Sequence, residues 1–149
     1  MRTTARDVTL SVLVALTVFA VGVGLLLAAE KTPFASLANL ATALTESDAD
    51  GALDLFDSNM KSYPEVERKL EALTAQDDIN CSIDVVSDEE TAGLHKLDLD
   101  WFMQLKSQID DSQLERRRER VKVEMRQIKG VWKITSLSPL SIFDPLQIR

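Results

Sequence analysis

The sequence predicts an α+β domain, with helices packed on a four-stranded antiparallel meander sheet, behind one N-terminal transmembrane helix. Three observations predict this fold. The chain opens with an uncharged stretch over residues 8–29, three segments with apolar residues at helical spacing follow, and four segments of alternating apolar and polar residues complete it. Because the helices precede the strands, we expect the helices to cover one face of the sheet.

The chain has 149 residues and a net charge of -7. An acidic domain is repelled by nucleic acid, so we expect no nucleic-acid partner. Cys81 is the only cysteine, which excludes an internal disulfide and a cysteine-based zinc site. We predict no cofactor.

Residues 8–29 are long enough to cross a bilayer as a helix. Arg2 and Arg6 precede them, so residues 1–7 should form a cytoplasmic tail, with the domain facing the periplasm or cell exterior of a bacterium. The segment then anchors the protein in the cytoplasmic (inner) membrane by a single pass. A cleaved signal peptide is the alternative, but a cut after Ala28 or Ala29 puts leucine at the third position before it, so we favour an uncleaved anchor.

The helical half begins at Thr32-Pro33, a cap followed by proline in the first turn. Apolar residues at helical spacing predict a first helix as far as Leu44, a short second helix over residues 52–60, and a third over residues 65–75.

Acidic residues in the turn Glu46–Asp57 match the spacing of a calcium-binding loop, with Gly51 at the sixth position. The first and last positions hold the wrong acids, and Pro64 leaves a short exiting helix. We therefore favour helix capping by Asp48 or Asp50 and keep a calcium-binding module as an alternative. Its ligands would be Asp48, Asp50, Asp54 and Asp57.

Alternation predicts strands over residues 79–85, 95–103, 114–128 and 131–138, with a polar turn at 88–90. The last two form a hairpin around Lys129-Gly130. A two-residue loop there places Met125 opposite Ile134 and Gln127 opposite Trp132, which gives the hairpin one apolar face.

Arg116, Arg118, Arg120 and Lys122 fall on one face of the third strand. Such a basic ridge could hold an anion. We favour a solvated outer face with Asp98 and Asp100 of the neighbouring strand as ion-pair partners.

Two segments resemble nuclear transport factor two-like domains: TALTESDADGALDLFDSNM, similar to their first helical turn, and Gly130-Val-Trp132-Lys-Ile134, similar to their terminal strand. The resemblance implies a cystatin-like α+β cone over residues 30–143, in which a curved sheet wraps helices and leaves a pocket at the wide end, with residues 144–149 as a tail. The family includes ketosteroid isomerase, cyclases and dehydratases, and members without catalysis. Its enzymes use an Asp base with Tyr and acid donors, or a His-Asp pair.

This chain departs from the enzyme pattern, because its only tyrosine, Tyr63, precedes a proline, and Asp98 and Asp100 should point away from the interior. His95 is the best single candidate for a pocket acid or base, because almost nothing else polar should point inward. We therefore favour an extracytoplasmic domain without catalysis that binds a small apolar ligand or an envelope protein and forms a homodimer through its sheet. A small isomerase, cyclase or hydratase using His95 is the alternative. The candidate pocket residues are His95, Leu97, Leu99, Trp101, Met125 and Trp132.

The C-terminal residues from Ser138 carry several apolar side chains after two prolines. Contiguous apolar residues are usually covered, so we expect this segment to fold back over the domain.

Overall fold

The computed structural model describes residues 32–147. The predicted tail and membrane span, residues 1–29, lie outside this part, and within it no helix is long and apolar enough to cross a membrane. The elements follow in the order α2 (Pro33–Thr45), α3 (Ala49–Leu53), α4 (Tyr63–Gln76), β1 (Asp77–Thr91), β2 (Leu94–Ser107), β3 (Leu114–Ile128), β4 (Val131–Ser138) and the 3₁₀ helix η1 (Leu140–Phe143).

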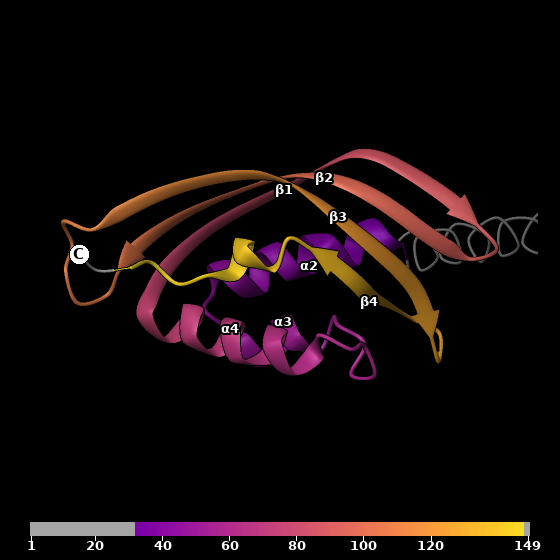
Figure 1. Cartoon of the computed structure of the whole chain (residues 1–149), viewed down its shortest axis with the longest axis horizontal. Coiled ribbons are helices and arrows are strands. Elements are labelled where there is room, and N and C mark those ends of the chain that lie inside the picture. The colour runs from indigo at the N-terminus through magenta and orange to yellow at the C-terminus, as the bar shows by residue number, and fades with distance from the viewer. Residues whose placement is uncertain (1–31, 148–149) are drawn as a thin grey trace, which may run out of the picture. The chain divides into compact units, whose positions relative to one another are not determined.

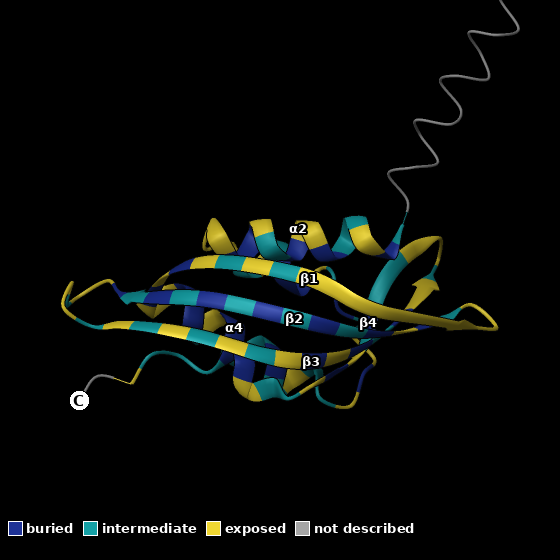
Figure 2. Ribbon diagram, turned by 90° about the horizontal axis from the view of Figure 1, so that it is seen from above, coloured by how far each residue is buried: buried dark blue, intermediate teal, exposed yellow. Residues whose placement is uncertain are grey.

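The four strands form one antiparallel sheet in the order β1-β2-β3-β4, which confirms the predicted meander. The sheet is curved, and α2 and α4 lie under its concave face (Figure 1). Seen from above, the exposed residues gather on the outer face of β3 and on the far half of β1, while β2 is largely buried (Figure 2). The prediction of an α+β domain with helices on one face of the sheet is confirmed.

The β3–β4 hairpin has the predicted turn and register. Lys129 and Gly130 have φ angles of 53° and 79°, as a two-residue hairpin loop requires, and Met125 lies opposite Ile134. The register then shifts between Glu124 and Met125. This irregularity lets Leu137 turn inward together with Ile134, although the two are an odd number of residues apart.

The prediction of a polar turn at residues 88–90 is wrong, because the β1–β2 turn lies further along the chain. β1 continues to Thr91, and Ala92 and Gly93, with φ angles of 51° and 80°, make the turn. The acids of β1 remain in the strand because this end of the hairpin extends beyond the helices, where polar side chains reach solvent.

The second helix is shorter than predicted, because α3 ends at Leu53 and does not reach Met60. The chain after it pairs with β4 instead: Ile134 donates its N–H to Leu55 O at 2.8 Å and accepts from Asp57 N at 2.8 Å. This pairing fixes the segment against the edge of the sheet.

The core lies between the sheet and the helices. Inward leucines of α2 and α4, including Leu40 and Leu70, meet a row of β2 residues that are fully buried. Ile142 and Phe143 of η1 are also fully buried in this core. The prediction that the C-terminal residues fold back over the domain is therefore confirmed.

Candidate functional site

His95 lies on the inner face of β2 and is 9% exposed. Its Nδ1 lies 2.9 Å from Asp88 Oδ1 and 3.0 Å from Oδ2, and its Nε2 lies 3.7 Å from Glu90 Oε2. The Trp132 ring meets the imidazole edge to face, with ring centroids 4.9 Å apart. The fold thus brings a histidine, two acids and an indole together from β1, β2 and β4.

The strand register explains this cluster. Glu90 lies directly opposite His95, and Asp88 lies opposite Leu97, so all four side chains point to the same face. A carboxylate that accepts from Nδ1 fixes the orientation of an imidazole, which is the arrangement of a His-Asp acid-base pair. Sequence reasoning missed Asp88 because it placed this residue in a turn.

The apolar pocket candidates are packed against other side chains. Leu97, Leu99, Trp101 and Met125 are at most 3% exposed, and Trp132 is half-buried. Phe143 occupies the space beneath Trp101, with ring centroids 5.5 Å apart at 80°. It also meets Phe56 edge to face at 6.1 Å. The residues expected to line a pocket fill a core in this region.

The C-terminal segment, residues 139–147, is held by a cation that is largely shielded from solvent. The Arg117 side chain is 11% exposed and donates from Nη1 to Ile142 O and Asp144 O, each at 2.8 Å. Its Nη2 donates to Glu115 Oε2 at 2.8 Å. Lys69 of α4 pairs with the Asp144 carboxylate. These charge-assisted bonds satisfy carbonyls at the end of η1.

Asp77 holds the far end of the same segment. Its Oδ2 accepts the N–H of Leu146 at 2.9 Å, and the residue is 1% exposed. Burial raises the pKa of Asp77, and it outweighs the Leu146 hydrogen bond and the charge of Arg117, which lower the pKa.

Several polar residues on the inner face were not predicted. Glu115, Arg117 and Glu119 of β3 lie opposite inward residues of β2 and so point into the domain. Glu119 Oε2 is buried and has no hydrogen-bond partner among the described residues. A signal for them existed: counting back by twos from the inward Val121 gives these three positions. The prediction that almost nothing polar points inward is wrong.

Cys81 also lies on the inner face, half-buried by its neighbours. Burial raises the pKa of its thiol to about 12. A thiol with this pKa is protonated at neutral pH, so Cys81 packs as a small apolar residue.

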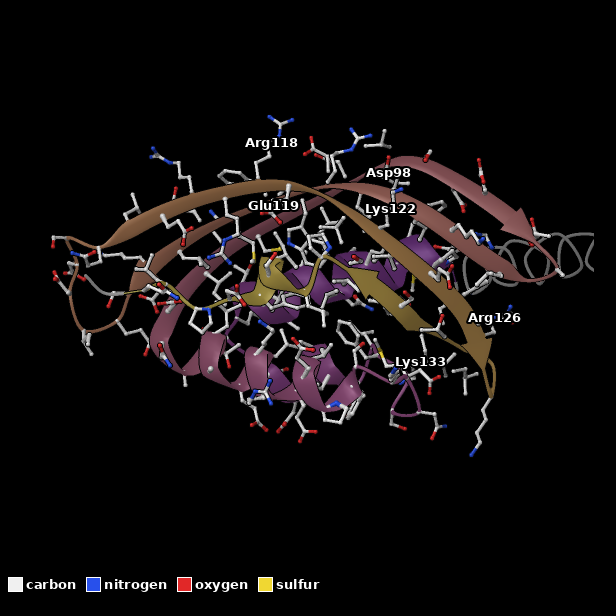
Figure 3. The ribbon with its side chains drawn as sticks, in the orientation of Figure 1. Asp98, Arg118, Glu119, Lys122, Arg126 and Lys133 are labelled. Carbon is white, nitrogen blue, oxygen red and sulfur yellow. The ribbon has the colours of Figure 1, made fainter. Side chains whose placement is uncertain are left out.

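The outer face carries the predicted ion pairs. Arg118 donates to both oxygens of Asp100 at 3.0 and 2.5 Å, and Arg120 to both oxygens of Asp98 at 3.4 and 2.9 Å. The arginines lower the pKa of both carboxyls. Arg118 points away from the helices, above the sheet (Figure 3). The predicted pairing of the arginine ridge with Asp98 and Asp100 is confirmed for Arg118 and Arg120.

A hollow of about 350 Å³ lies on the outer face beside these pairs. Its lining combines both signs of charge with hydroxyls: Ser87, Glu89, Lys96, Asp98, Lys122, Glu124, Ser136 and Ser138.

The acids of the 46–57 turn serve the local backbone. Asp48 Oδ1 accepts from Gly51 N at 2.9 Å and caps α3, as predicted, and Asp57 Oδ1 accepts from Asn59 N at 3.0 Å. A Cβ at Gly51 would lie 2.2 Å from Asp48 Oδ2, so a larger residue there would make the Asp48 carboxylate shift. Asp50 lies in the first turn of α3, and Asp54 ends it. Within residues 32–147, no three or more acids, histidines or cysteines are grouped to hold a metal ion.

No protein-family model matches the sequence, and no curated protein matches it. Solved structures do. A protein of unknown function from Mycobacterium tuberculosis matches with a TM-score of 0.57 at 11% identity, over 69% of this chain and 65% of that one, so the chain spans less than two thirds of it.

The names of two further matching structures refer to a known fold family or to one of its enzymes. A ketosteroid isomerase-like protein from Erwinia carotovora matches with a TM-score of 0.57 at 9% identity, over 69% of this chain and 88% of that one. A protein assigned as a dehydratase of the nuclear transport factor two-like family, from Streptomyces avermitilis, matches with a TM-score of 0.52 at 16% identity, over 68% and 88%. At such identities the likeness shows the fold, and the domain has the nuclear transport factor two-like fold.

Proposed function

We propose that this protein is a membrane-anchored binding domain without catalytic activity, displayed outside a bacterial cytoplasmic membrane, and that its partner is a protein. The proposal combines the uncharged segment over residues 8–29, preceded by Arg2 and Arg6, with the packing of the domain.

The packing of Phe143 is the observation that supports the proposed absence of catalysis. Its ring takes the space under Trp101 that a substrate would need, and Ile142 beside it is fully buried as well. A close-packed interior favours recognition at the surface over chemistry inside. For the same reason we favour a protein partner over a small apolar ligand.

A homodimer through the outer sheet face is part of the proposal. The hollow there carries Lys96 and Lys122 beside Glu89 and Glu124. In a two-fold dimer each surface meets itself, so a face with both signs of charge can pair each lysine with a glutamate of the other copy. Light scattering on the purified protein should give twice the chain mass, and Lys122→Glu should lower it.

Uptake of the apolar dye N-phenyl-1-naphthylamine tests the filled interior. We expect no saturable binding to the full chain, and binding to Phe143→Ala, in which truncation leaves an apolar cavity. Saturable binding of the dye to the unaltered protein, with the bound dye shielded from quenchers in solution, would contradict the proposal. Alkaline extraction of membranes tests the anchor separately, because a spanning helix stays in the pellet.

A small pocket enzyme using His95 is the second candidate, and the Asp88 pair at 2.9 Å favours it. Two of the matching folds are named for an isomerase and a dehydratase. A catalytic base must be reachable by its substrate. His95 is the only histidine in the chain, so its acylation by diethyl pyrocarbonate can be followed alone. A rate close to that of free imidazole would support the enzyme, and a rate lower by about 100-fold would count against it.

A further inference from the structure

One edge of β3 has no neighbouring strand over half its length. β4 pairs with β3 only between Lys122 and Ile128, whereas β2 pairs with it from Leu114 to Met125. None of the described backbone hydrogen bonds joins residues 114–121 to another segment on the β4 side. Figure 2 shows β3 as the outermost strand at the end of the domain near the C-terminus.

The strand pattern shows which backbone groups face this edge. Ser107 N donates to Gln113 O, so odd-numbered residues of β3 turn their groups toward β2. Thr135 Oγ1 of β4 donates to Glu124 O on the other side. Since these directions alternate along an antiparallel strand, the N–H and C=O groups of Arg116, Arg118 and Arg120 point out from the open edge.

The same three residues carry the charge of this edge. Their side chains lie on the outer face, about 7 Å apart along the strand. The Arg118 and Arg120 side chains are 73% and 58% exposed even while they pair with Asp100 and Asp98. A row of exposed guanidinium groups therefore borders the open backbone groups in a chain whose net charge is -7.

The inner side of the edge has two further features. Glu119 Oε2 is buried without a hydrogen-bond partner among the described residues, although a buried carboxylate oxygen is costly to leave unpaired. A hollow of about 300 Å³ lies beside the start of β3, between Glu115, Arg117 and residues 144–147. An additional strand could place side chains at both positions.

We propose that the open edge of β3, residues 114–121, binds an extended segment of a partner protein as a fifth strand. The segment carries acids at alternate positions, opposite Arg116, Arg118 and Arg120, and a hydrogen-bond donor between them, opposite Glu119. This proposal rests on the proposed binding function and names the class of its partner.

A second copy of this chain does not fit the edge. Consider two copies of residues 114–121 that pair about a two-fold axis perpendicular to the sheet. Outer-face residues of one copy then lie opposite outer-face residues of the other. Every such register places the arginine row opposite itself, and like charges at opposed positions destabilise a strand pair. The charges thus select a foreign acidic segment.

A peptide titration followed by NMR tests the proposal on the full chain in zwitterionic micelles. The probes are two blocked octapeptides, one alternating glutamate with serine and one alternating lysine with serine. We expect the glutamate peptide to bind at least about tenfold more tightly. It should also slow hydrogen exchange at the amides of Arg116, Arg118 and Arg120, which face the open edge.

Matched variants locate the site. Arg116→Glu combined with Arg118→Glu should lower the affinity at least about tenfold, and the milder Arg116→Gln should lower it in the same direction. The control is Arg126→Glu combined with Lys129→Glu, the same charge change at the end of β3 that β4 covers and in the turn that follows it.

Three results would overturn the proposal: equal affinity for both peptides, an equal loss in the control variant, or binding that leaves the three amides unprotected. If these appear while the interior still excludes the apolar dye, the edge site is wrong and the binding function stands. Dye uptake by the unaltered protein instead contradicts the proposed function itself.

Discussion

Phe143 and Trp101 pack edge to face, with ring centroids 5.5 Å apart at 80°, and both side chains are fully buried. One ring comes from η1, after the last strand, and the other from the middle of β2. The final turn of the described chain is therefore part of the domain core.

Replacement of Phe143 by alanine should lower the free energy of unfolding by about 3 to 5 kcal/mol, because it removes a buried ring and leaves a cavity. Urea denaturation measures the change. Phe34→Ala is the matched control, since Phe34 is 45% exposed and should cost less than about 1 kcal/mol. Equal losses in the two variants would show that Phe143 is not buried as described.

Arg117→Met should lower the free energy of unfolding by about 2 to 3 kcal/mol, because it leaves the carbonyls of Ile142 and Asp144 without their charged donor. It should also make residues 139–147 more sensitive to a non-specific protease. Arg116→Met at the exposed neighbouring position should change stability by less than about 0.5 kcal/mol. A stable, protease-resistant Arg117→Met protein would contradict the role given to this side chain.

The raised pKa of Asp77 makes a signed prediction. In the unfolded chain Asp77 loses its proton around its ordinary pKa of 3.8, whereas in the folded protein it keeps the proton to a higher pH. Its contribution to the free energy of unfolding therefore falls as the pH rises from 3.8 to the folded pKa. Asp77→Asn keeps an oxygen for the N–H of Leu146 and removes the titration. Relative to the unaltered protein, the variant should therefore gain stability as the pH rises through this window.

Urea denaturation between pH 3 and pH 7 measures the difference, with Asp78→Asn at the exposed neighbouring position as control. A constant difference across this range for Asp77→Asn would mean that burial does not govern the Asp77 carboxyl.

Cys81 should resist alkylation in the folded protein. Burial raises its thiol pKa to about 12, so only a very small fraction is thiolate at pH 8. Iodoacetamide should label the native protein at least about 100-fold more slowly than the same protein in guanidinium chloride, as measured by mass spectrometry. Comparable rates would place the thiol in solvent.

The sequence predicted the parts of this fold that depend on local signals. The Lys129-Gly130 turn and the alternation beside it are sufficient to place Met125 opposite Ile134, because a two-residue loop leaves one register. The pairing of Arg118 and Arg120 with Asp100 and Asp98 follows from the face each residue occupies.

The inner polar residues escaped prediction for different reasons. Asp88 was assigned to a turn, because a strand end beyond the core has no apolar partner to mark its period. Arg117 and Glu119 lie where β3 continues past β4, and the role of Arg117 depends on its contact with the C-terminal segment. That contact joins residues distant in the chain and leaves no local pattern.

A crystal structure under xenon pressure tests the filled interior most directly, because xenon occupies apolar cavities that are large enough to hold it. We expect no xenon between the sheet and the helices of the unaltered protein, and one site in Phe143→Ala at the place of the missing ring. A xenon atom in the unaltered protein between His95, Met125 and Trp132 would reveal an open pocket beside the His95-Asp88 pair and would contradict the account.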